Sequence, residues 1–370
     1  MLLAAPGLQA GPREQARRIH ERLAGVPPSE AVLGNMEADV ASSNATAAAY
    51  TAMQNSNFYS VTLKNFAAPW TNRDQSVFVP LNDYTATIIG MVRDDVPFNT
   101  VLSANLVYVG TGSGVPLYSP TNNDNYQALD DQSADLKTRL TATTQTATSG
   151  LPDAATAGVI TTRAAAEAFF VAGTNRAMFR FTLMNHMCKD LEQVHDTSRA
   201  PDRIRQDVSR SPGGDSRIFL NNCIGCHSGM DPLAQAYAYY TFDTTQGRIQ
   251  YTPGVVQPKY FNNDATFPYG YRTPDDHWTN YWRAGQDALL GWDSQLPGSG
   301  TGAKSMGQEL ANSTAFARCQ VEKVFRNVCL RSPVDGSDRA QVDSMVSAFR
   351  SGGYRLKQVF AESAAYCMGD

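Results

Sequence analysis

Residues 222–232 of the chain read Asn-Cys-Ile-Gly-Cys-His-Ser-Gly-Met-Asp-Pro and contain the pattern C-x-x-C-H. If the segment is helical, the thiols of Cys223 and Cys226 lie one turn apart on one face, with the imidazole of His227 beside them. Two thiols at this spacing can add to the two vinyl groups on one edge of a haem, and the histidine then lies beneath the iron. The pattern therefore predicts one covalent haem c, attached through Cys223 and Cys226 and ligated by His227.

Two other uses of paired cysteines need a context that the sequence does not provide. A zinc ribbon needs two C-x-x-C pairs, whereas the remaining cysteines occur singly, at Cys188, Cys319, Cys329 and Cys367. A thioredoxin-type redox pair needs a strand–helix–strand context, and the sequence around this motif has a polar, helical pattern. A metal site and a disulfide are therefore kept as the weaker alternatives to haem.

The residues after the motif predict a helix that covers the cofactor. Asp231 and Pro232 form a favourable helix start, because an acidic N-cap is followed by proline at the first helical position. Leu233, Tyr237 and Tyr240 would then share one face of that helix. We expect this face, and Tyr237 in particular, to contact the porphyrin; packing in the core is the alternative for each tyrosine.

Three segments of the chain together resemble a known family. Cys188 is followed by CIGCHSGMDPLAQAYAYYTFD, and the C-terminal part contains LANSTAFARCQVEKVFRNVC and FRSGGYRLKQVFAESAAYC. These segments resemble the planctomycete-type monohaem cytochrome c proteins, in which a cysteine-ending helix precedes a C-x-x-C-H-x-x-x-D-P core and a helical tail follows. Met230 and Leu233 depart from the commoner I-D-P-x-G-F form of that core. The resemblance implies a secreted, mostly helical protein with one covalent haem and a role in electron transfer.

Composition and charge exclude several classes of protein. With 42% hydrophobic and 18% charged residues, the chain has the balance of a globular protein and not that of a disordered, collagenous or coiled-coil one. The formal net charge is -4 and no long block of like charges occurs, so we expect no nucleic-acid partner. No apolar run approaches the roughly 18 residues that a membrane span needs.

Helical periodicity predicts a mainly α protein, an irregular multi-helix fold with a cytochrome c-like haem region and long loops. Residues 1–10 are similar to the end of an export signal, with a frayed terminus as the alternative. We predict an N-terminal helical domain over 11–115, a loop or linker region over 116–162, and a haem-binding helical domain over 163–370 that ends in three packed helices. The apolar runs 84–92 and 101–109 fit either strands or buried helices.

The residue on the far side of the iron separates the functions that a haem protein can have. His or Met on both faces makes an electron carrier, whereas an open face binds oxygen, peroxide or a small substrate. His277 and Met306 are the leading candidates, because the loop-rich segment that carries them could wrap the haem edge. Met230 is too close to the proximal ligand to reach the opposite face, and we do not favour His186 or His195. Another His or Met and an open face are the alternatives.

An aromatic cluster lies near one of these candidates. Trp278, Tyr281, Trp282 and Trp292 crowd into a short segment. They could shield a haem edge, form a docking surface for a partner or bind a ligand ring by stacking, although packing in the core is the commoner role.

The four single cysteines predict two disulfides. Cys319 and Cys329 lie on one predicted helix, about 15 Å apart, which is too far for them to bridge each other. Cys329 with Cys367 would join two antiparallel helices, and Cys188 with Cys319 would tie the helix before the motif to the tail. Four cysteines allow three pairings, so the sequence leaves the connectivity open, and free buried thiols are the alternative.

These observations predict a periplasmic or extracellular c-type cytochrome that transfers single electrons. Its partners would be other redox proteins or subunits of an electron-transfer complex. The first alternative is a haem oxidoreductase, similar to a peroxidase, with an open distal face. The second is a partner-binding or assembly subunit in which the haem is ancillary.

Overall fold

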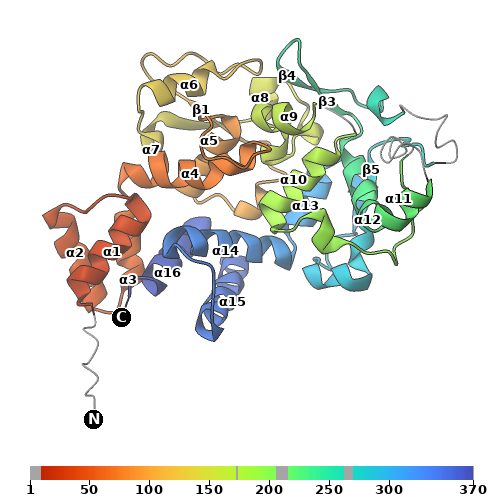
Figure 1. Ribbon diagram of the computed structural model, residues 1–370. Coiled ribbons are helices and arrows are strands. Elements are labelled where there is room, and N and C mark those ends of the chain that lie inside the picture. The colour runs from red at the N-terminus through yellow and green to blue at the C-terminus, as the bar shows by residue number, and fades with distance from the viewer. Residues whose placement is uncertain (1–9, 172–173, 206–215, 262–269, 370) are drawn as a thin grey trace.

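The computed structural model describes residues 10–171, 174–205, 216–261 and 270–369. Within these ranges the chain is mainly helical, with long irregular connections and three small two-stranded sheets (Figure 1). The predicted fold class is therefore confirmed. The proposed export-signal remnant, residues 1–10, lies outside the described residues except for Ala10.

Three helices form the N-terminal end: α1 (Pro12–Ala24), α2 (Glu30–Ala41) and α3 (Ala45–Ala52). Proline suits the first turn of α1, where its missing N–H has no helical partner to lose, and Gly25 ends the helix with a φ of 71°. Ser29 caps α2 by accepting a hydrogen bond from the N–H of Val32. α1 and α2 both lie within the range 11–115 that the sequence predicts to be helical.

The middle of the chain folds around one buried helix, α5 (Asp83–Arg93). Before it come η1 (Phe58–Leu63), α4 (Lys64–Ala67) and η2 (Ala68–Thr71), and after it η3 (Phe98–Thr100) and β1 (Val107–Gly110). All residues of α5 before Arg93 are buried. The ambiguous run 84–92 is therefore helix, and only the last residues of the run 101–109 are strand.

Residues 116–162, predicted as loops or a linker, contain further short elements. These are α6 (Asp124–Asp131), α7 (Leu136–Arg139), β2 (Leu140–Thr143), α8 (Gln145–Ser149), η4 (Asp153–Ala155) and η5 (Gly158–Thr161). β2 pairs antiparallel with β1. Tyr126, Leu129 and Leu140 lie in the main apolar cluster, so a few apolar side chains within a Thr- and Ser-rich stretch tie this segment to α5.

The second half begins with α9 (Arg163–Phe169) and α10 (Arg176–Met187) and continues with η6 (Leu191–Val194). After the C-x-x-C-H motif come β3 (Tyr240–Asp243), β4 (Arg248–Tyr251), η9 (Pro258–Tyr260), β5 (His277–Thr279), η10 (Tyr281–Arg283), η11 (Gly285–Leu290), β6 (Ser299–Thr301) and α13 (Gly302–Ala311). β3 pairs with β4, and β5 with β6, both antiparallel.

The C-terminal helices are α14 (Thr314–Cys329), α15 (Gly336–Ser351) and α16 (Leu356–Tyr366), and they pack on one another as predicted. α16 also packs against α1 and α3, which brings the first and last helices of the fold together (Figure 1). Arg18 and Gln15 of α1 donate hydrogen bonds to the carbonyl oxygens of Met368 and Gly369, at 2.6 and 2.7 Å.

Two disulfides connect these elements. Cys188, at the end of α10, bonds to Cys319 in α14, and Cys329, at the end of α14, bonds to Cys367 after α16. The two predicted disulfides are therefore confirmed, with α14 tied at one point to the helix before the motif and at the other to the C-terminal helix.

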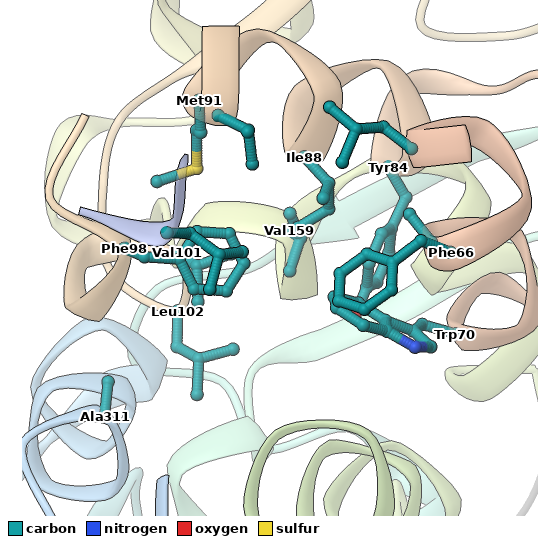
Figure 2. Close-up of a cluster of buried hydrophobic side chains, with 14 of the residues drawn as sticks. Phe66, Trp70, Tyr84, Ile88, Met91, Phe98, Val101, Leu102, Val159 and Ala311 are labelled. Carbon is teal, nitrogen blue, oxygen red and sulfur yellow. The ribbon is translucent and has the colours of Figure 1, made fainter. Parts of the chain in front are cut away.

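One apolar cluster runs through most of the molecule. Figure 2 shows its middle part, where Phe66 and Trp70 from α4 and η2 lie close to Tyr84 of α5, while Leu102 extends toward Ala311 of α13. The cluster contains side chains from each of the ranges 11–115, 116–162 and 163–370.

Candidate functional site

The C-x-x-C-H motif lies at a junction between two helices. α11 (Ser216–Asn222) ends immediately before Cys223, and α12 (Ile224–Ala234) begins immediately after it. The N–H of His227 donates to the carbonyl oxygen of Cys223 at 3.1 Å, so the motif itself forms the first helical turn. Cys223, Cys226 and His227 therefore share one face. α11 and α12 lie at the end of the molecule away from α1, α2 and α3 (Figure 1).

The predicted helix start at Asp231 and Pro232 is wrong. α12 begins at Ile224, and Pro232 lies in its last turn. Because proline lacks an N–H, it cannot bond back to the carbonyl of Ser228, and α12 ends two residues later. Tyr237 then lies in η8 (Gln235–Tyr237) and Tyr240 in β3, so the expected common helical face does not exist.

Two glycines explain why a glycine-rich segment is helical here. Gly225 and Gly229 lie on the face of α12 opposite to His227. A Cβ atom on Gly225 would lie 2.3 Å from Nε2 of His195, and one on Gly229 would lie 1.9 Å from Nε1 of Trp282. The missing side chains therefore let α12 pack closely against η6 and η10 and fix its position.

The two motif cysteines keep their thiols, while the other four cysteines form disulfides. Both side chains are partly exposed. Sγ of Cys226 lies 3.5 Å from the carbonyl oxygen of Leu191, to which the thiol donates. Burial raises the pKa of the Cys226 thiol, and the charge of Glu192 adds to this shift. The thiol is therefore protonated at neutral pH, the form that retains a hydrogen to add to a double bond.

His227 faces a buried carboxylate four residues further along the same helix. Its Nδ1 lies 3.2 Å from Oδ1 of Asp231, whose side chain is 0% exposed. Arg176, at the start of α10, donates to both oxygens of Asp231, from Nε at 2.8 Å and from Nη2 at 2.7 Å. Burial would raise the pKa of Asp231, but the charges and hydrogen bonds of Arg176 and His227 hold it well below its usual range.

A second arginine completes the surroundings of Asp231. Arg205 is buried, and its Nη2 donates to the carbonyl oxygen of Asp231 at 3.0 Å while its Nη1 donates to that of Thr174 at 2.8 Å. Its guanidinium also lies 4.6 Å from the centre of the Tyr260 ring. Arg176 and Arg205 thus connect the end of α12 to two segments that precede the motif in the chain.

These residues fit a covalently attached haem. Two thiols and an imidazole lie on one helical turn, and one ring nitrogen of the imidazole faces a carboxylate, as is usual for a metal-ligating histidine. Within the described ranges, no group of three or more His, Cys, Asp or Glu side chains is arranged to hold a metal ion. The strands of the same ranges form only antiparallel pairs and one isolated parallel bridge, so the described residues give the motif no strand–helix–strand setting.

The structure places the other predicted site residues as follows. Tyr237 is fully buried, with its ring 5.4 Å from that of Phe170. His277 is partly exposed in β5, a strand that packs against α12. Met306 is fully buried in the main apolar cluster on α13. Contact of Tyr237 with a porphyrin, and ligation by His277 or Met306, stay predictions.

Two of the three clustered tryptophans lie in the core. Trp278 and Trp282 are fully buried, and Nε1 of Trp278 donates to Oγ of Ser305 at 2.8 Å. Trp292 donates from Nε1 to the carbonyl oxygen of Trp282 at 2.9 Å. Because Trp282 covers the face of α12 opposite to His227, its contact supports the helix that carries the motif.

His186, which we do not favour as an iron ligand, is fully buried, with its Nε2 2.7 Å from the hydroxyl oxygen of Tyr84. Burial, with a smaller effect of Lys323, holds its pKa well below the usual range, so the imidazole is neutral. Its surroundings are those of a core residue.

Comparison of the chain with family models, with curated proteins and with solved structures gives no match. In the described part of the chain, every helix is too short or too polar to span a membrane.

Proposed function

We propose that the chain is an exported c-type cytochrome that carries one covalent haem and transfers single electrons. The different states of the six cysteines carry this proposal. Four of them pair with one another, and the two that keep their thiols lie on the helical turn that also bears His227. If Cys223 and Cys226 were only structural, there would be no reason for them to stay reduced while the other four cysteines form disulfides.

Cys223 and Cys226 would hold the haem through two thioethers, and forming these bonds needs no oxidant. Each thiol would add across one vinyl double bond of the haem, with the sulfur bonded to one vinyl carbon and the thiol hydrogen transferred to the other. His227 would ligate the iron, and its Nδ1 lies 3.2 Å from Oδ1 of Asp231. The haem supplies an iron that alternates between the ferric and ferrous states by one electron. The partners are other one-electron redox proteins or subunits, one of which donates that electron and another accepts it.

The disulfides support the proposed location. Cys188–Cys319 and Cys329–Cys367 persist in an oxidising compartment such as the periplasm or the extracellular space, and not in a reducing cytoplasm. Export would place both the disulfide cysteines and the haem site in that oxidising compartment.

Haem staining after denaturing electrophoresis tests the proposal. Protein exported by a host that matures c-type cytochromes should keep its stain in the gel, and Cys226→Ala should lose stable haem retention. The double variant Cys329→Ser/Cys367→Ser is the matched control, because it removes two cysteines without touching the motif and should stain. Absence of stain in the unmodified chain would refute the proposal.

A haem oxidoreductase with an open distal face is the second candidate, and the carboxylate behind His227 favours it, because such a partner makes the ligand more basic. Optical spectra of the reduced protein separate the two candidates. A carrier should keep a low-spin spectrum when carbon monoxide is added, whereas a haem with an open distal face should bind carbon monoxide rapidly.

His277→Ala should alter the spectrum if His277 is the distal ligand; an unchanged low-spin spectrum would favour Met306 or another residue.

A further inference from the structure

The carboxylate of Asp231 is held on both of its oxygens. Oδ1 accepts from Nε of Arg176 at 2.8 Å and lies 3.2 Å from Nδ1 of His227. Oδ2 accepts from Nη2 of Arg176 at 2.7 Å and from the backbone N–H of Arg205 at 3.4 Å. Rotation of this carboxylate would break the two-point contact with Arg176, so the position of Oδ1 is fixed before any haem binds.

A fixed acceptor selects one form of the imidazole. An ionised carboxylate can only accept hydrogen bonds, and a neutral imidazole has one N–H and one lone pair. In the neutral form that can ligate a metal, the N–H opposite Oδ1 is therefore on Nδ1, which leaves the lone pair on Nε2. His227 and Asp231 are four residues apart on α12, so the helix itself keeps the two groups on one face.

We infer that Asp231 is the positioning residue of the haem ligand: it orients His227, presents Nε2 to the iron, and lowers the reduction potential of the haem, while Arg176 limits that effect. This inference rests on the proposed function. A negative acceptor makes the imidazole more basic and stabilises ferric over ferrous iron, because the ferric ion carries the higher charge. The cation of Arg176 draws charge away from His227 and acts in the opposite direction.

The two partners therefore give variants with opposite effects. Asp231→Asn keeps the size of the side chain and removes its charge, so we expect at least a tenfold shift of the ferric–ferrous equilibrium toward ferrous, equivalent to about 59 mV upward for one electron. Arg176→Gln leaves the carboxylate without its main cation, so we expect a downward shift. Redox titration of the haem protein measures both shifts.

The control is a second pair of a buried aspartate and an arginine, far from the motif. Asp338 of α15 is 1% exposed in its side chain and pairs with Arg331. Asp338→Asn should destabilise the protein in the manner of Asp231→Asn and leave the potential unchanged. If Asp231 served stability alone, all these variants would have the reduction potential of the unmodified protein, and that result would overturn the inference. Shifts of the potential in the same direction for Asp231→Asn and Arg176→Gln would overturn it as well.

A second measurement needs no haem. ¹⁵N NMR of the haem-free chain should show the proton of His227 on Nδ1, and a mixture of both tautomers in Asp231→Asn. A proton on Nε2 in the unmodified chain would overturn the inference. If the unmodified chain holds no covalent haem, the proposed function fails, and the tautomer of His227 still decides whether Asp231 selects it.

Discussion

The packing of α12 requires a residue as small as glycine at position 229. A Cβ atom there would lie 1.9 Å from Nε1 of the fully buried Trp282. We expect Gly229→Ala to lower the free energy of unfolding by about 1–3 kcal/mol, because the tryptophan must move within a packed core. Gly34 of α2 has no atom within 4 Å of the equivalent position. Gly34→Ala should therefore gain about 0.5–1 kcal/mol, and denaturant titration of both variants measures the contrast. Equal effects would contradict the packing.

Asp287 makes the free energy of unfolding depend on pH, and a single variant can measure this contribution. Burial, with the nearby charge of Asp196, raises its pKa to about 6, above the value of about 3.9 in an unfolded chain. Between these values the folded state binds more protons than the unfolded state, so stability falls as the pH rises from about 4 to about 6 and then levels off. The melting temperature relative to Asp287→Asn should follow this curve. Asp287→Glu keeps a carboxyl and should keep the slope; a flat difference would show that the pKa is not raised.

The sequence predicts the motif residues but not their surroundings. Cys223, Cys226 and His227 are recognisable because their spacing is local. Arg176 and Arg205 come from distant segments, so no local pattern connects them to Asp231. The spacing of four residues between His227 and Asp231 is a usable signal, but it becomes visible only if the helix begins within the motif and not at Asp231.

At the scale of elements, local signals and tertiary contacts disagree at identifiable places. The predicted start at Asp231 is a sound local signal that the structure does not use, because contacts of Gly225 and Gly229 hold a helix that begins at Ile224. The three C-terminal helices have strong apolar periodicity and lie where it predicts them. Residues 116–162 lack such periodicity, and three of their short elements, α7, β2 and η5, pack against α5.

The Cys329–Cys367 bond joins two of these helices and closes a loop with a sequence separation of 38. In the chain-entropy model a loop of this length stabilises the fold by about 4 kcal/mol. Cys329→Ser/Cys367→Ser should therefore lower the free energy of unfolding by up to that amount, as measured in urea under non-reducing conditions. Ser351→Ala, an exposed change at the end of α15, is the control and should have little effect. A loss below about 0.5 kcal/mol would be the size of an ordinary surface substitution and would indicate that the bond does not form.

At the scale of the whole molecule, the six cysteines report on the compartment and the cofactor together. In the exported haem protein, four form disulfides and two would form thioethers, so the denatured chain should show no reactive thiol. A reductant opens disulfides but leaves thioethers intact. After reduction, alkylation and mass spectrometry should therefore find label on Cys188, Cys319, Cys329 and Cys367 alone, with the haem on the peptide that contains Cys223 and Cys226. The same chain made in a reducing cytoplasm should label at all six positions without added reductant. Label on the motif cysteines of the exported protein after reduction would mean that no thioether had formed there, and the proposed cytochrome would lose its basis while the two disulfides kept theirs.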